Sequence, residues 1–343
     1  MRILVTGHRG YIGTVMVPMV RRAGHEVLGI DSDLYRNSVY GEAPTGFDEL
    51  IKDIRDVEKE DLAGVDAIIH LAGLSNDTLG DLNPTLTYEI NHAASVRLAG
   101  MAKELGIGRF VFASSCSNYG AAGDRVQDET GHLNPVSPYA KSKVMVETDL
   151  AQMADDRFSP VFMRNATAYG ISPRIRFDLV LNNLTAWGYT TGKILLKSDG
   201  TPWRPLVHIE DISLAAIAAA ESPRDVVHNQ AFNVGLDSEN YQMRDLAAIV
   251  RDTVPDCEIA FAEGAEPDKR NYRVSFAKYR DAFPDHPLRW NARRGAAQIY
   301  ESYRAHGLGK DEYEGPRFRR IAQLRQLLDS GQLDDTLRWR QPA

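Results

Sequence analysis

The chain has 343 residues, 43% of them hydrophobic and 25% charged, which is the composition of a globular enzyme large enough for two domains. A formal net charge of −7 argues against nucleic acid or an anionic membrane as the main partner, and only two cysteines exclude a disulfide framework. The chain enters an apolar run at Ile3, so we expect no leader, and no stretch approaches the roughly 20 apolar residues of a membrane span. We therefore expect a cytoplasmic protein, and we predict no metal site.

The first residues predict a strand, a glycine turn and the start of a helix, in that order. The apolar run Ile3–Val5 leads into Gly7, Gly10 and Gly13, and helix-compatible residues follow up to Arg22. Glycines let the backbone approach a dinucleotide pyrophosphate closely, and the N-terminus of the helix offers free N–H groups. The alternative is a tight strand–helix turn that binds no ligand.

Strands and helices then alternate through the first half of the chain. The second apolar run, Glu26 to Ile30, ends at Asp31, where an acid could reach the adenosine ribose. The polar stretch from Ser32 to Glu49 follows, and we expect it to form a loop. Three further strands are predicted at 65–71, 109–113 and 159–163, and two helices at 84–105 and 138–153. This alternation predicts an α/β fold, a Rossmann-type doubly wound parallel sheet with its ligand at the carboxyl ends of the strands.

The alternation breaks near residue 169, where we expect a smaller C-terminal substrate-binding lobe. The pattern predicts helices at 177–188, 210–220 and 244–254, a strand at 193–196, and a strand at 231–234 that returns to the main sheet. We assign residues 1–168, with returning segments near 205–237, to dinucleotide binding, and 169–204 and 238–300 to the lobe. Residues 301–343 are expected to form a solvated helical tail, or else a partner-binding face.

Three residues could carry acid–base chemistry. Tyr139 and Lys143 are four residues apart, so they share one face of the predicted helix. A lysine ammonium beside a phenol stabilises the phenolate, and a hydroxyl from Ser115, at the end of a predicted strand, could bind the same substrate oxygen. Together these groups could take a proton from an alcohol while a nicotinamide takes the hydride. The alternative is a surface pair on a helix with no chemical role.

With these motifs in place, the chain resembles the extended short-chain dehydrogenase/reductase family, in particular its nucleotide-sugar epimerases, dehydratases and reductases. The resemblance covers residues 1 to about 285. It rests on the segments GHRGYIG (7–13), DIRD (53–56), HLAG (70–73), SSCSNYG (114–120), YAKSK (139–143), RNATAYG (164–170) and RPLVHIEDI (204–212), together with Asp31 and Asn91.

The resemblance implies NAD as cofactor, a nucleotide-activated sugar as substrate, and a homodimer formed through the helices at 84–105 and 138–153. Catalysis would fall to Ser115, Tyr139 as base, and Lys143. The residues implied at the cofactor are Gly7, Arg9, Gly10, Tyr11, Ile12, Gly13, Asp31, Asp53, Ile54, Leu71, Ala72, Gly73, Asn91, Ser114, Tyr139 and Lys143. Those implied at the substrate are Ser115, Cys116, Ser117, Tyr139, Thr167, Asn183, Leu184, Arg204, Arg270 and Arg273.

The chain departs from the family pattern at several of these positions. Dehydratases of the family carry Asp-Glu directly after the catalytic hydroxyl, and decarboxylases usually keep the glutamate, whereas this chain has Cys116 and Ser117. Thr167 replaces a family asparagine, and the late Arg-Pro-Gly-Asp stretch is reduced, which leaves Arg270 or Arg273 as substitutes. Cys116 is either an inert packed thiol, which we favour, or a nucleophile or acid.

These observations favour an NAD-dependent nucleotide-sugar epimerase that works through a transient ketosugar. Asp31 favours NAD because its carboxylate would repel a ribose 2′-phosphate. Arg9, however, lies where some reductases of the family hold that phosphate, so the alternative is an NAD(P)H-dependent ketosugar-nucleotide reductase or reductase/epimerase. A sugar dehydratase and a non-catalytic dinucleotide-sensing regulator fit the sequence less well.

Overall fold

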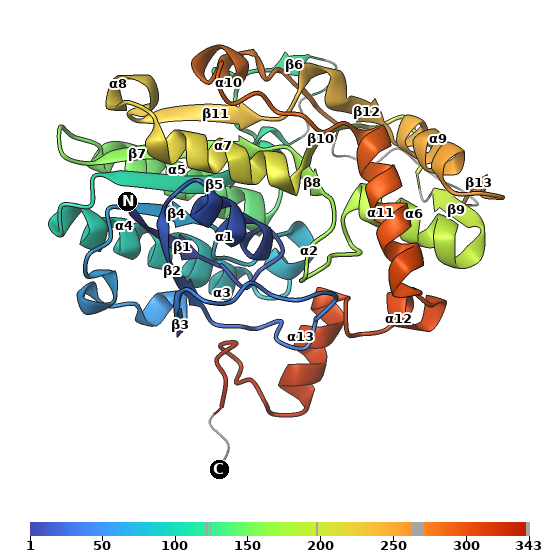
Figure 1. The fold of residues 1–343 in the computed structure, drawn as a ribbon, viewed down its shortest axis with the longest axis horizontal. Coiled ribbons are helices and arrows are strands. Elements are labelled where there is room, and N and C mark those ends of the chain that lie inside the picture. Colours follow the sequence, from blue (N-terminus) through green and yellow to red (C-terminus); the bar gives the residue numbers. More distant parts are fainter. Residues whose placement is uncertain (121–122, 124, 197, 263–270, 341–343) are drawn as a thin grey trace.

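The core of the molecule is a seven-stranded parallel sheet (Figure 1). The computed structural model describes residues 1–120, 123, 125–196, 198–262 and 271–340. The strand order is β11-β7-β5-β4-β1-β2-β3, so the chain winds outward from β1 in one direction and then in the other. The strands are β1 (Arg2–Thr6), β2 (Glu26–Asp31), β3 (Asp48–Ile51), β4 (Ala67–His70), β5 (Arg109–Ser115), β7 (Ser159–Asn165) and β11 (Gln230–Val234).

Helices cover both faces of this sheet because both faces are apolar. Helices α1 (Gly13–Arg22) and α7 (Ile209–Glu221) pack on one face, and α4 (Ala94–Glu104) and α5 (Pro138–Met153) on the other (Figure 1). Successive side chains of one strand enter opposite layers, as β1 shows: Ile3 and Val5 belong to one cluster and Leu4 to the other. The predicted doubly wound sheet, including the return of β11, is confirmed.

Two local predictions differ from the structure. β3 begins within residues 32–49, the stretch predicted to form a loop, and continues to Ile51; its four side chains are exposed at the edge of the sheet, so no buried apolar pattern marks the strand. The helix predicted at 84–105 divides into α3 (Pro84–Tyr88), a π-helical turn (Glu89–Ala93) and α4. The helix predicted at 138–153 has those bounds, and Ser137 caps it by accepting a hydrogen bond from the N–H of Ala140.

The smaller lobe lies beyond the carboxyl ends of the central strands (Figure 1). Its larger elements are α6 (Val180–Thr191), α9 (Met243–Thr253), α11 (Ala292–His306), the strand pair β9 (Lys193–Leu196) and β13 (Glu258–Phe261), and the three-stranded sheet of β8 (Thr167–Tyr169), β10 (Trp203–His208) and β12 (Asn240–Gln242). The short elements are α2 (Asp77–Gly80), α8 (Arg224–Val227), α10 (Ala277–Ala282), α12 (Lys310–Glu314), β6 (Val126–Gln127) and β14 (Arg273–Val274).

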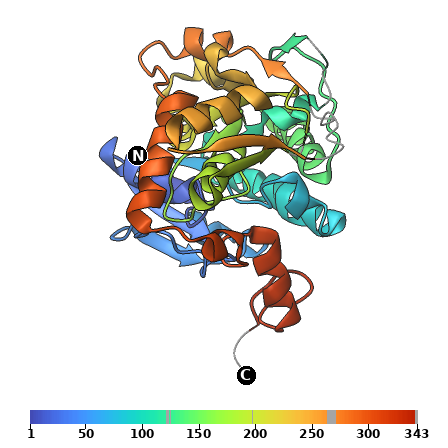
Figure 2. The same cartoon turned by 90° about the vertical axis from the view of Figure 1, so that its right-hand side faces the viewer.

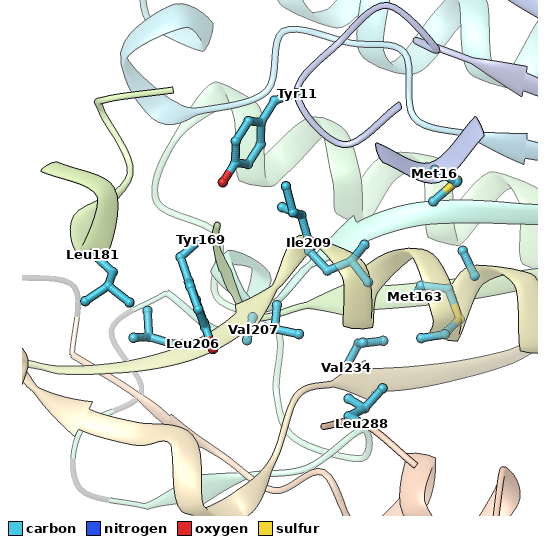
Figure 3. Close-up of a cluster of buried hydrophobic side chains, with 14 of the residues drawn as sticks. Tyr11, Met16, Met163, Tyr169, Leu181, Leu206, Val207, Ile209, Val234 and Leu288 are labelled. Atoms are coloured by element: carbon cyan, nitrogen blue, oxygen red, sulfur yellow. The ribbon is translucent and has the colours of Figure 1, made fainter. Parts of the chain in front are cut away.

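A continuous apolar cluster joins this lobe to the sheet. Figure 3 shows Tyr11, from the glycine turn, in one cluster with Tyr169 and Leu206 of β8 and β10. The Tyr11 hydroxyl donates to the carbonyl oxygen of Gly170 at 2.7 Å, and burial raises the pKa of that phenol. The start of the chain is therefore tied to the first residues of the lobe.

The C-terminal segment is not the solvated tail that its charge pattern predicts. Helix α13 (Arg320–Asp329) and the residues after it lie below the sheet in Figures 1 and 2. Leu324, Leu327 and Leu337 are each at most 3% exposed and belong to the same core cluster as Leu4 of β1. The segment is thus packed into the body of the protein, because leucine spacing within a charged sequence supplied one apolar face.

Candidate active site

A cavity of about 840 Å³ opens at the carboxyl ends of the strands, between the sheet and the lobe. Parallel α/β sheets bind their ligands at this edge. The volume lies within the range of pockets that bind small molecules and cofactors. The lining includes most of the residues predicted from sequence: Gly7, Arg9, Gly10, Tyr11, Ile12, Gly13, Asp31, Asp53, Ile54, Leu71, Ala72, Gly73, Ser114, Ser115, Ser117, Tyr139, Lys143, Thr167, Asn183, Leu184 and Arg204.

The glycine turn has the geometry that a dinucleotide diphosphate requires. Gly7 has φ +74, and a Cβ there would lie 2.9 Å from the backbone nitrogen of Ala72. A Cβ on Gly13 would lie 2.2 Å from the carbonyl oxygen of Gly7, so the turn packs against the start of α1 without side chains. No side chain caps the N-terminus of α1, and its positive end faces the cavity. The residues present therefore fit a dinucleotide.

Beside the turn, three carboxylates surround the place predicted for the adenosine ribose. Asp31 accepts hydrogen bonds from the backbone N–H groups of Arg9 (2.9 Å) and Asp33 (2.7 Å), which fixes the carboxylate at the cavity wall. The Arg9 guanidinium forms ion pairs with Asp33 at 2.7 Å and Glu49 at 2.8 Å, and the pKa of Glu49 falls to about 2, chiefly through the hydrogen bond from Arg9. Arg9 is therefore already paired with two acids, and the local charge disfavours a 2′-phosphate.

Ser115, Tyr139 and Lys143 meet at the other end of the cavity. Ser115 ends β5, and its hydroxyl lies near that of Tyr139 from α5, where it offsets part of the rise in the pKa of the phenol. The Lys143 ammonium donates to the carbonyl oxygen of Ala113 at 2.8 Å. Burial raises the pKa of Tyr139 to about 12, and burial lowers the pKa of Lys143 to about 8. Burial thus moves the two pKa values apart, so the phenol keeps its proton at neutral pH and the ammonium is the more acidic of the two groups.

A buried ion pair behind β5, which the sequence analysis missed, positions these groups. Glu147, one turn beyond Lys143 on α5, forms an ion pair with Arg164 of β7 at 2.6 Å. Ser114 donates its hydroxyl hydrogen to the same carboxylate. Together they fix the end of β5, and hence Ser115, against α5. The spacing of Tyr139, Lys143 and Glu147, at i, i+4 and i+8 on one helix face, was the available signal.

The lobe completes the cavity with residues that the sequence did not single out. The lining there includes Arg176, Asp178, Trp187, Met243 and Tyr272. Asp77, at the start of α2, also lines the cavity near Tyr139 and accepts a hydrogen bond from the Ser137 hydroxyl at 2.5 Å. A mixed aromatic and cationic surface of this kind can accept a base and a phosphate.

Of the other four predicted site residues, three do not line the cavity and the fourth lies outside the described residues. Cys116 is 1% exposed, and its thiol donates to the carbonyl oxygen of Arg164 at 3.1 Å, so it points into the core. Asn91 holds the backbone of Leu74 instead, accepting from its N–H at 2.7 Å and donating to its carbonyl oxygen at 3.0 Å. The Arg273 guanidinium lies 5.1 Å from the ring centroid of Trp203 and outside the lining, while Arg270 lies outside the described residues.

Searches for other kinds of site give no further candidate. No helix in the described ranges is long and apolar enough to cross a membrane. Among the residues that the structure places, no three His, Cys, Asp or Glu side chains gather as a metal ion would need.

A Rossmann-type sheet, a glycine turn with an acid at the end of the next strand, and a Ser–Tyr–Lys trio define a dinucleotide-dependent enzyme of the extended short-chain dehydrogenase/reductase type. A model of the NAD dependent epimerase/dehydratase family matches residues 3–235, and the chain belongs to this family. The enzymes of the family use NAD and act on nucleotide sugars.

Individual relatives have several different activities. The chain is 29% identical over 333 residues to UDP-glucuronic acid decarboxylase 1 of Arabidopsis thaliana, an alignment that covers 92% of this chain and 72% of that protein. It is 24% identical over 326 residues to UDP-glucose 4-epimerase of Bacillus subtilis (strain 168), covering 87% and 94%. Among solved structures, MoeE5 in complex with UDP-glucose and NAD matches with a TM-score of 0.76 at 25% identity. The match covers 90% of this chain and 100% of the MoeE5 chain.

Proposed function

We propose that the protein is a nucleotide-sugar epimerase that oxidises a ring hydroxyl to a ketone, lets the intermediate turn, and reduces it from the other face. The dinucleotide would bind to the segments 1–168 and 205–237, and the nucleotide sugar to 169–204 and 238–300. Bound NAD supplies the acceptor and then the donor of the hydride. The remaining steps belong to side chains of this chain.

Tyr139 is the base in this proposal. Its hydroxyl, which lies near that of Ser115, would take the proton of the sugar hydroxyl and later return it. Lys143 stabilises the phenolate electrostatically, and its hydrogen bond to Ala113 holds the ammonium in place. Ser115 donates to the sugar oxygen and fixes its distance from Tyr139.

The observation that favours epimerisation over elimination or decarboxylation is the pair of residues after Ser115. Cys116 is packed in the core, and Ser117 presents a small hydroxyl to the cavity wall, so neither position offers a carboxylate to the sugar. The hydroxyl oxygen of Ser117 is buried and has no hydrogen-bond partner among the described residues, which leaves it available to a sugar oxygen.

The arrangement at Arg9 weakens the reductase alternative. A reductase that uses NADPH would need a cation to bind the 2′-phosphate, but the Arg9 guanidinium already forms ion pairs with Asp33 and Glu49. An epimerase regenerates its cofactor in each turnover, so selection has no need for fast exchange and NAD can remain bound.

The decisive experiment combines cofactor identification with product analysis. Purified protein is denatured and the released nucleotide is identified by mass spectrometry. Intact protein is then incubated with UDP-glucose, UDP-galactose or UDP-glucuronic acid without added nucleotide, with the Tyr139→Phe variant as control. Recovered NAD and interconversion of epimers, absent in the variant, would support the proposal. A 4-keto-6-deoxy product would overturn it and point to Asp77 as the acid, and release of CO₂ would indicate a decarboxylase. Cofactor-free protein that consumes NADPH with a ketosugar nucleotide would indicate the reductase.

A further inference from the structure

One buried cation at the cavity has no counter-ion among the described residues. Arg320, the first residue of α13, is 7% exposed and lines the cavity. Its guanidinium lies over the ring of Tyr35, 4.1 Å from the ring centroid, and it donates no hydrogen bond to any residue that the structure places. A buried charge without a partner is costly, so a site that retains one is built for an anion from outside the chain.

The nearby carboxylates are already occupied. Asp178 forms an ion pair with Arg176 at 2.7 Å, and Asp31 accepts two backbone hydrogen bonds, from Arg9 and Asp33. Arg176 also approaches Arg320 closely enough that, after burial, its charge is the next cause that lowers the pKa of Arg320, to about 10. Because Asp178 balances the charge of Arg176, the charge of Arg320 is left at this part of the described cavity wall for an anion to balance.

The position of Arg320 identifies which end of the cavity that anion occupies. Tyr35, on which Arg320 stacks, lies in the loop that follows Asp31, and this loop forms the cavity wall beside the glycine turn. The substrate end, with Arg204, Trp187 and Tyr272, belongs to the lobe. A dinucleotide laid from Asp31 across Gly10 brings its diphosphate to the Arg320 side of the cavity.

The C-terminal segment that carries Arg320 is anchored on the same loops. Trp339 donates its indole N–H to the carbonyl oxygen of Ser32 at 2.8 Å, and the Arg36 guanidinium lies 3.4 Å from the centroid of the Trp339 ring. Arg338 forms an ion pair with Asp56. These contacts join residues 32–36 and 53–56, which border the cavity, to the last described residues of the chain.

Leu337 belongs to the same C-terminal segment and lies at the cavity wall. It is 2% exposed, lines the cavity, and has φ +61, a conformation that is strained for a leucine. Its neighbours Thr336 and Arg338 bind Arg55 and Asp56, directly after the Asp53 and Ile54 predicted at the adenine. The strained backbone of Leu337 places its apolar side chain at the end of the cavity where the adenine is predicted to bind.

We propose that Arg320 binds the diphosphate of the bound dinucleotide, and that the C-terminal segment 316–340 thereby closes the adenosine end of the site. The dinucleotide then contributes the missing anion to the segment, and the segment must detach before the dinucleotide can leave. The inference rests on the NAD dependence of the family and is independent of the epimerase proposal.

Arg320→Met tests the binding role, because it removes the charge and keeps a stem over Tyr35. The matched control is Arg325→Met, which removes the same charge from an exposed position of α13. Titration calorimetry on the full-length protein freed of nucleotide would measure affinities for NAD, ADP, adenosine and UDP. We expect Arg320→Met to weaken NAD and ADP about tenfold or more and adenosine less than twofold. An equal loss for adenosine, no loss for NAD, or a loss confined to UDP would overturn the assignment.

Melting temperatures separate binding from a merely structural role. Without nucleotide, Arg320→Met should melt at the wild-type temperature or above it, because it relieves an unpaired buried charge, and saturating NAD should raise its melting temperature less than that of the wild type. A lower melting temperature without nucleotide, with an unchanged rise on adding NAD, would make Arg320 structural.

The closure itself is tested with Arg338→Ala, which breaks the ion pair to Asp56 outside the cavity lining. Release of NAD from the holoenzyme, chased with excess ADP-ribose, should be several-fold faster than in the wild type and in Arg325→Met. Limited proteolysis after residue 316 should slow when NAD is added. Unchanged release together with unchanged proteolysis would refute the closure.

Discussion

The ammonium group of Lys143 lies 5.8 Å from the centroid of the Tyr139 ring, one turn further along the same helix. It is close enough to stabilise a phenolate, yet its hydrogen bond goes to the backbone of Ala113 rather than to the phenol. In the proposed mechanism the ammonium therefore acts on Tyr139 through its charge, and Ser115, whose hydroxyl lies near the phenol, holds the sugar oxygen. Tyr139 and Lys143 therefore have separate roles, and replacing each should have a different effect.

Replacing Tyr139 by phenylalanine should lower turnover about 10²- to 10⁴-fold, because only the group that transfers the proton is removed. NAD binding should stay within a few-fold of wild type, since the ring keeps its place in the cavity wall. Steady-state kinetics and a nucleotide titration on the same preparation measure both. Turnover within tenfold of wild type would remove Tyr139 from the role of base.

Replacing Lys143 by methionine should stabilise the nucleotide-free protein at pH 7. Burial lowers the pKa of Lys143 from 10.5 to about 8, a difference equivalent to about 3 kcal/mol, and the lost hydrogen bond offsets about 1 kcal/mol of it. The net gain in free energy of unfolding is about 2 kcal/mol.

The stability difference between the wild type and Lys143→Met depends on pH, because the folded and unfolded states release the Lys143 proton at different pH values. Below pH 8 the lysine is charged in both the folded and unfolded states, and the folded state bears the full burial cost. Between about pH 8 and 10.5 the folded wild type has lost this proton, while the unfolded chain still holds it, so the wild type gains stability with rising pH. The advantage of Lys143→Met should therefore shrink over that window in denaturant titrations, and a constant advantage would contradict the burial argument.

The sequence predicted the parts of the site that follow from local pattern. The glycine turn, Asp31 and the Tyr139–Lys143 pair depend on spacing within one element, and the cavity lining contains all of them. The Glu147–Arg164 ion pair could not be paired from sequence, because α5 and β7 meet only in the folded sheet. The docking of Arg320 on Tyr35 joins residues 285 positions apart, and no periodicity reports such a contact.

Cofactor choice should respond to the acids that hold Arg9. Asp33→Asn with Glu49→Gln removes both charges and keeps the shapes, so the Arg9 fork becomes free to bind a 2′-phosphate. We expect NADP affinity to rise about tenfold, and Asp31→Ala to weaken NAD far more than NADP. Asp48→Asn, an exposed acid on the same strand, is the control for net charge. Wild-type protein that already prefers NADP would contradict the role given to Asp31.

The outer faces of α4 and α5 should form a homodimer interface. Met145 on α5 is 39% exposed, and the partly buried Val96 and Val144 lie on the outer parts of the same two helices. Light scattering at micromolar concentration should give the mass of a dimer, and Met145→Glu should shift it towards a monomer because a carboxylate would be buried. Phe261→Glu, at an exposed position of the lobe, should leave the mass unchanged. A monomeric wild type would refute the prediction.

Cys116 should prove chemically inert although it follows Ser115 directly. Burial raises the pKa of its thiol well above the ordinary value, and its hydrogen bond goes to the backbone of Arg164 rather than to the cavity. In a Cys257→Ala background, alkylation of Cys116 should therefore be slow until the protein unfolds. Cys116→Ala should keep turnover within about threefold while lowering the free energy of unfolding by about 1 kcal/mol, the cost of a small cavity. Rapid alkylation that bound substrate prevents, together with a hundredfold loss of turnover in Cys116→Ala, would instead return the thiol to the reaction as an acid.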